Sequence, residues 1–211
     1  MNPYYSNDAN DPSNPWLSIW IRPKETIRDL VRTPSKMPIV LAILFGIIMI
    51  LDYMSNRSWG DSSPLFFIFF ITFIFGPMIG IIGWFVASTI CFGLGRLFGG
   101  TATFHETRLA VAWAAIPYVV KGLIWFPQLL IYGRDMFTST TPVMDNSFIL
   151  TLFYFLLALL EFVFVFWHLV VLSKALGEVH QFSSWKGFAS VVTVPVSFFL
   201  VLFIIAGILY A

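Results

Sequence analysis

Three of the residues in this chain that could do chemistry interrupt long apolar runs. Lys121, Glu161 and His168 each stand among mostly apolar neighbours. An unpaired charge in hydrocarbon costs at least about 2.5 kcal/mol, so ionisable residues inside membrane spans are usually paired and face the bundle interior. We therefore expect Lys121 to contact Glu161, directly or through water. The pair is either an ion pair that fixes the register of two helices or a site for a proton or a substrate.

His168 follows Glu161 by seven residues, which places both side chains on one face of a helix, about 10 Å apart along its axis. A carboxylate and an imidazole on one face could pass protons along a span. The alternative is that the ring forms a hydrogen bond with a neighbouring backbone or hydroxyl group.

A second group of possible ligands lies in the loops: His105, Glu106, Glu178 and His180. Together with His168 they could form a nitrogen–oxygen metal site if two hairpins lie side by side. Their spacing does not match a zinc motif, and Thr103 with Glu106 is typical of a capping box that opens a helix. Metal binding is therefore the weaker alternative. No nucleophile–base pair, hydrolase motif or nucleic-acid patch is present, so we expect no cofactor, no enzymatic activity and no nucleic-acid partner.

The elements that position these residues are long apolar runs. Only 11% of the 211 residues are charged, and the mean hydropathy is +0.85. A soluble domain averages about 25% charged residues. Segments of about 20 apolar residues cross a bilayer as helices. We predict an all-α, polytopic membrane protein. Its five expected transmembrane helices cover residues 37–54, 65–98, 109–132, 147–172 and 187–210.

Three parts of the chain follow from this pattern: a disordered tail at 1–12, an amphipathic segment at 13–36, and the five-helix transmembrane domain at 37–211. In the second part, Trp16 and Trp20 share a helical face, and indole rings favour the headgroup layer of a bilayer.

Basic residues on another face of the amphipathic segment, Lys24, Arg28 and Arg32, are each four residues apart. Such residues can hold anionic lipid headgroups at about 1 kcal/mol each. The alternative is that they only enforce topology. Membrane lipids are therefore the expected partners, with other membrane proteins or a second copy of the chain as further possibilities.

Lysine and arginine are distributed unevenly between the two sides of the expected bundle. Nine of the 12 precede the first span or lie in the second and fourth loops, and only Arg57 and Arg134 lie in the first and third. The positive-inside rule then predicts a cytoplasmic N-terminus in the cell membrane, with the C-terminus on the opposite side.

The second apolar run is longer than one perpendicular crossing requires, so we expect a tilted helix that bends near Pro77. It carries a stripe of small residues at Gly76, Gly80, Gly83 and Ala87. Small side chains at this spacing allow another helix to approach closely. The stripe is predicted to be an internal seam or, alternatively, an oligomer interface.

The segment from Asn14 to Ile27, with its Asn-Pro-Trp opening, resembles the start of bacterial Yip1-domain proteins. So do Gly99–Phe104 before the third span, Pro117 within it, and Leu176–Phe182 before the fifth. The resemblance implies an integral membrane protein, agrees with the five-span layout, and supplies no catalytic residue that could be carried over. Eukaryotic relatives associate with one another and with Rab GTPases, through a long cytoplasmic N-terminus. The segment before the first expected span is short here, so we expect no GTPase role. We expect a protein that organises lipids or partner proteins, or alternatively a small transporter, channel or lipid-moving protein.

Overall fold

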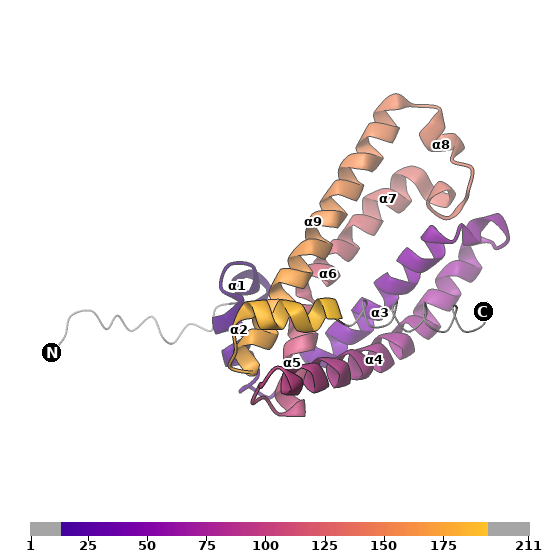
Figure 1. The fold of residues 1–211 in the computed structure, drawn as a ribbon. Helices are drawn as coiled ribbons and strands as arrows, with labels where there is room; N and C mark the ends of the chain where they lie inside the picture. The colour runs from indigo at the N-terminus through magenta and orange to yellow at the C-terminus, as the bar shows by residue number, and fades with distance from the viewer. Residues whose placement is uncertain (1–13, 194–211) are drawn as a thin grey trace, which may run out of the picture.

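The computed structural model describes residues 14–193, and the regular elements in this part of the chain are helical (Figure 1). Four helical segments are long and apolar enough to cross a membrane. They are Met37–Asn56 (α3), Leu65–Leu97 (α4), Phe104–Phe137 (α5 to η4) and Phe148–Val179 (α9). The expectation of an all-helical, multi-pass chain is therefore confirmed for four candidate spans.

The fifth expected span, 187–210, falls mostly outside the described residues, as does the expected tail at 1–12. Residues 184–193 form a helix up to the end of the described part. Two further boundaries differ from expectation. The third span begins earlier than residue 109 because the capping box of Thr103 and Glu106 starts a helix at Phe104. The fourth continues past 172 to Val179.

The third candidate span is a series of short helices. They are α5 (Phe104–Ala114), α6 (Ile116–Lys121), η3 (Gly122–Ile124), α7 (Trp125–Tyr132) and η4 (Gly133–Phe137). Pro117 and Pro127 lie near the breaks. Proline lacks the backbone N–H that would continue the helical ladder, so each removes a hydrogen bond and disturbs the preceding turn. The loops hold η2 (Trp59–Asp61) and α8 (Pro142–Asp145).

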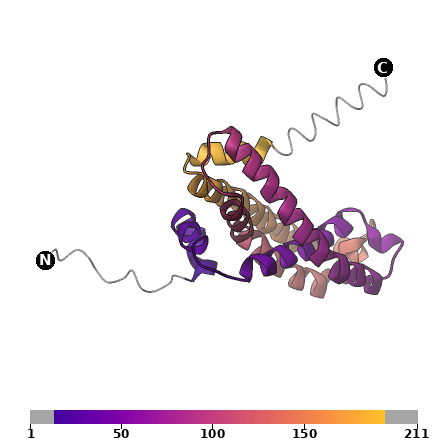
Figure 2. The same ribbon diagram turned by 90° about the horizontal axis from the view of Figure 1, so that it is seen from below.

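The amphipathic segment before the spans divides into two helices, α1 (Pro15–Ile21) and α2 (Pro23–Leu30), each with proline in its first turn. Ile19 and Ile27 are fully buried, because α2 packs on α9 and α5 while α1 lies against α2 and α6. Figures 1 and 2 place both helices at one end of the bundle, which we call the α1–α2 end.

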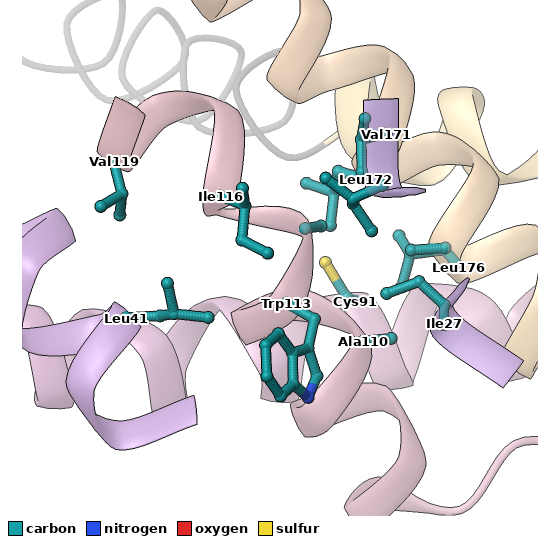
Figure 3. Packing of buried hydrophobic residues seen from close by; sticks show 13 residues of the cluster. Ile27, Leu41, Cys91, Ala110, Trp113, Ile116, Val119, Val171, Leu172 and Leu176 are labelled. Carbon is teal, nitrogen blue, oxygen red and sulfur yellow. The ribbon is translucent and has the colours of Figure 1, made fainter. Parts of the chain in front are cut away.

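A buried apolar cluster joins the elements at this end. Figure 3 shows Ile27 of α2, Leu41 of α3, Cys91 of α4, Ala110 of α5 and Leu176 of α9 converging on it. Each side chain is at most 5% exposed. The short N-terminal helices are therefore part of the same packed body as the spans.

Helices α3 and α4 pack closely as an antiparallel pair through glycine. A Cβ on Gly46 of α3 would collide with the backbone of Gly76 and Gly80, and a Cβ on Gly80 would collide with the carbonyl oxygen of Ala42. The N-terminal half of the expected stripe is therefore an internal seam. The other half is not, since a Cβ on Gly83 would meet nothing within 4 Å, and Ala87 lines a cavity.

Candidate functional site

Lys121 lies inside the bundle at the C-terminal end of α6, and its side chain is only 5% exposed. Its Nζ donates to both carboxylate oxygens of Asp52 on α3, at 2.7 Å and 2.6 Å. Asp52 is the only charged residue in the first apolar run, and the residue pattern alone did not identify it as a partner of Lys121. This bidentate contact is the closest ion pair of Lys121.

Two further donors surround Asp52. The hydroxyl of Tyr118 donates to Oδ2 at 2.7 Å, and the indole Nε1 of Trp125 donates to Oδ1 at 3.1 Å. Buried carboxylates are tolerated when donors satisfy their oxygens. Asp52 therefore serves as the acceptor at the centre of a network that joins α3, α6 and α7.

Glu161 of α9 forms the other side of this network. Its Oε2 lies 3.7 Å from Nζ of Lys121, so the expected contact between these residues is present. The distance exceeds that of a hydrogen bond, and Lys121 binds Asp52 more closely. The Oε1 atom accepts a hydrogen bond of 2.7 Å from Nε2 of Gln128 on α7. We call Asp52, Tyr118, Lys121, Trp125, Gln128 and Glu161 the polar cluster.

The polar cluster contains two carboxylates and one ammonium group, so their formal charges leave one negative charge. The side chain of Glu161 is 23% exposed, and Oε1 of Gln128 is buried with no hydrogen-bond partner among the described residues. The arrangement can hold helices in register, and it can also accept a proton or a cation. It contains no serine, cysteine or threonine that could act as a nucleophile.

His168 is not hydrogen-bonded to Glu161 within the described residues. Its Nδ1 lies 2.9 Å from the carbonyl oxygen of Ala114, and its ring lies 5.9 Å from the rings of both Phe45 and Tyr118, measured between centroids. The carbonyl oxygen left free at the α5–α6 break thus has the imidazole as a partner. The backbone hydrogen bond expected as the alternative to a relay is present.

His168 also lines an apolar cavity of about 220 Å³ that lies between α3, α4, α5 and α9. Gly83 and Ala87 of the small-residue stripe face this cavity. The imidazole is one of few polar groups in a lining that is otherwise aliphatic and aromatic.

The four loop residues considered as metal ligands do not come together as a site. Within residues 14–193, no group of three or more His, Cys, Asp or Glu side chains is arranged to hold a metal ion. Glu106 completes the capping box with Thr103, and Glu178 accepts a hydrogen bond of 2.6 Å from Arg28. His105 lies near Arg108 instead. These separate partners explain the residues without a metal.

His180 has a structural environment of its own just beyond α9. The ring is 1% exposed, stacks on Phe182 at 5.2 Å between centroids, and its Nε2 lies 3.3 Å from Oγ1 of Thr107. A Cβ on Gly95 or Gly100 would collide with it. Burial, reinforced by the nearby Arg96, lowers the pKa of His180. The ring therefore packs the connection between α4 and α5 against the end of α9.

The expected headgroup-binding residues divide into two sets. Trp16 and Trp20 pack against the bundle, and the indole of Trp20 meets the ring of Phe164 edge-on at 5.7 Å between centroids. Arg28 is paired with Glu178, and this hydrogen bond raises the pKa of its guanidinium. Lys24 and Arg32 form no ion pair with a residue in the described part of the chain.

Comparison with known proteins identifies the family. The model of the Yip1 domain matches residues 17–206, which is most of the chain and includes α1, α2 and all four candidate spans. The chain belongs to the Yip1 domain family. Members of this family are generally non-enzymatic membrane proteins. No curated protein and no solved structure matches the chain.

Proposed function

We propose that this Yip1 domain protein is a non-enzymatic component of the cell membrane that organises lipids or partner proteins through α1 and α2. The match to the family and the four candidate spans support a membrane role. The contacts with lipids or partner proteins are assigned to the α1–α2 end, which contains two short amphipathic helices and several basic residues.

One observation carries the proposal: α1 is apolar on both sides. Ile19 is fully buried against the bundle, whereas Leu17 and Ile21 are 69% and 82% exposed. An apolar face that points away from the protein is favourable where hydrocarbon replaces water. We infer that α1 lies in the interface of the bilayer with Leu17 and Ile21 directed into it.

The basic residues give the proposed orientation. The α1–α2 end holds Arg22, Lys24, Arg32, Lys174 and Lys186 among others, and the opposite end holds Arg57 and Arg134. Cytoplasmic loops carry the excess of lysine and arginine. The proposal therefore places α1 and α2 on the cytoplasmic surface.

The experiment measures how deeply α1 lies in a bilayer. Single cysteines replace Leu17, Ile21 or Glu25 in a Cys91→Ala background and carry an environment-sensitive fluorophore in liposomes. We expect blue-shifted emission at positions 17 and 21, and water-like emission at position 25, whose side chain is exposed on α2. Water-like emission at all three positions would contradict the proposal.

A crosslinking experiment tests what α1 contacts in a cell membrane. A photoreactive residue at position 17 or 21 should form adducts with lipids or membrane proteins, and the same residue at Asp29 should form fewer. Equal adduct formation at the three positions, or none, would argue against an organising role for α1.

A second candidate function, transport, is favoured by the polar cluster, where two carboxylates share one lysine inside the bundle. A path for protons or ions would use Lys121, Glu161 and His168. Flux through liposomes should then be lost in the Lys121→Met/Glu161→Gln double variant. The organising function predicts instead that the intact protein moves no protons, ions or lipids.

A further inference from the structure

A small basic pocket lies where the turn between α1 and α2 meets α9. Its volume is about 330 Å³. It is lined by Ile21, Arg22, Pro23, Lys24, Glu25 and Lys174. Lys174 is distant in sequence from the other five, so only the packing of α2 on α9 brings these residues together.

The charges around this pocket are unbalanced. Arg22, Lys24 and Lys174 are cationic, and Glu25 is the one carboxylate in the lining. Glu25 lies 3.9 Å from Arg22, and both side chains are more than 60% exposed, so their attraction is weak. Lys24 and Lys174 have no carboxylate within ion-pair distance in residues 14–193. The pocket therefore suits an anion.

A neighbouring pocket at the same end provides an internal comparison. It is lined by Arg28 and Arg32 but also by Glu106 and Glu178. Arg28 already binds Glu178 at 2.6 Å. The charges there are equal in number and partly paired within the protein, so that pocket has less capacity for an added anion.

The basic pocket also has an apolar border. Ile21 belongs to its lining and is 82% exposed, and Leu17 lies one helical turn earlier on the same side of α1. An anion that carries hydrocarbon would contact both the lysines and these side chains. A free anion would leave the apolar border unused.

We propose that this pocket binds the phosphate group of an anionic phospholipid, with Lys24 and Lys174 as its principal cations and Ile21 against the acyl chains. This inference rests on the proposed function, because the pocket meets lipid only if α1 lies in the bilayer interface. It adds Lys174, which the sequence pattern of the amphipathic segment does not reveal.

The test titrates the full-length protein in detergent with short-chain phosphatidylglycerol and counts bound lipids by native mass spectrometry. Phosphatidylcholine and inorganic phosphate are titrated in parallel. Each lysine near a lipid surface contributes about 1 kcal/mol, which corresponds to about five-fold in Kd. The Lys24→Ala/Lys174→Ala double variant should therefore bind phosphatidylglycerol about 25-fold more weakly.

Lys186→Ala is the matched control, because Lys186 is also a lysine at the α1–α2 end but donates to the carbonyl oxygen of Phe98. The affinity of the Lys186→Ala variant for phosphatidylglycerol should remain unchanged. The Lys24→Arg/Lys174→Arg variant should retain most of the affinity, which separates loss of charge from loss of fold.

Three results would overturn the inference: equal affinity for phosphatidylglycerol and phosphatidylcholine, no effect of the double alanine variant, or competition by inorganic phosphate at concentrations equal to those of the lipid. The third would indicate a site for a free anion. Fluorophores at positions 17 and 21 separate the two proposals. Blue-shifted emission with no lipid preference would reject only the pocket, and water-like emission would reject both.

Discussion

Replacement of Asp52 by asparagine should destabilise the protein more than replacement of Glu161 by glutamine. The side chain of Lys121 is 5% exposed. With the neutral amide of the Asp52→Asn variant, its one remaining ion-pair partner within residues 14–193 would be the carboxylate of Glu161 at 3.7 Å. Removing one partner of a buried ion pair costs about 3–5 kcal/mol, because the other charge stays buried without compensation. The remaining attraction between Glu161 and Lys121 reduces this loss. We therefore expect Asp52→Asn to lower the free energy of unfolding by about 3 kcal/mol.

Glu161→Gln removes the more distant partner, while the bidentate contact between Lys121 and Asp52 remains. We expect a cost of about 1 kcal/mol, as for a typical hydrogen bond or partly exposed ion pair. The Asp52→Asn/Lys121→Met double variant should be more stable than Asp52→Asn alone, because no uncompensated ammonium is left.

The assay is denaturant-induced unfolding in detergent, followed by tryptophan fluorescence. Glu25→Gln is the control for loss of a carboxylate, because the ion pair of Glu25 with Arg22 is exposed. The stability of this variant should change by less than about 0.5 kcal/mol. If Glu161→Gln cost as much as Asp52→Asn, or if Lys121→Met failed to restore stability, the assignment of Asp52 as the principal partner would be refuted.

Two further predictions concern the tight contacts. Gly80→Ala should destabilise the protein by about 1–3 kcal/mol, because the added Cβ collides with the backbone of α3. Gly83→Ala should be nearly neutral in the same unfolding assay, because its Cβ would meet nothing within 4 Å. Equal destabilisation by the two substitutions would contradict the internal seam between α3 and α4. Burial lowers the pKa of His180 in the folded protein, so the unfolded chain takes up a proton first as the pH falls, and stability should decrease below about pH 6.5 until the folded pKa is reached. Between about pH 7 and about pH 5, the unfolding temperature should decrease less for His180→Asn than for the parent protein. If both proteins showed the same pH dependence, groups other than His180 would cause the decrease.

Local sequence signals predicted the starts of helices well. Thr103 and Glu106 form the expected capping box, and Pro23, a residue that favours the first turn of a helix, lies at the start of α2. These devices act between residues a few positions apart, so their geometry follows from the sequence itself.

The polar cluster was only half visible in the sequence. Tyr118, Lys121, Trp125 and Gln128 are spaced by three and four residues, a polar stripe that could have indicated one face turned toward a partner. Asp52 could also have been identified from the sequence, because it is the only charged residue in the first apolar run. The pattern did not reveal that Asp52, rather than Glu161, binds Lys121 most closely, since both carboxylates belong to helices adjacent to the third span.

The sequence by itself determined that this chain crosses a membrane several times, because a backbone in hydrocarbon must satisfy its own hydrogen bonds and long apolar runs can do so only as helices. The tertiary structure decided which residues come together: Asp52 with Lys121, Gly46 with Gly80, and Lys24 and Lys174 around one pocket. Each of these contacts depends on the rotation and depth of one helix relative to another, and on the breaks in the third span. Those quantities are set by packing across the whole bundle, which no local pattern of residues specifies.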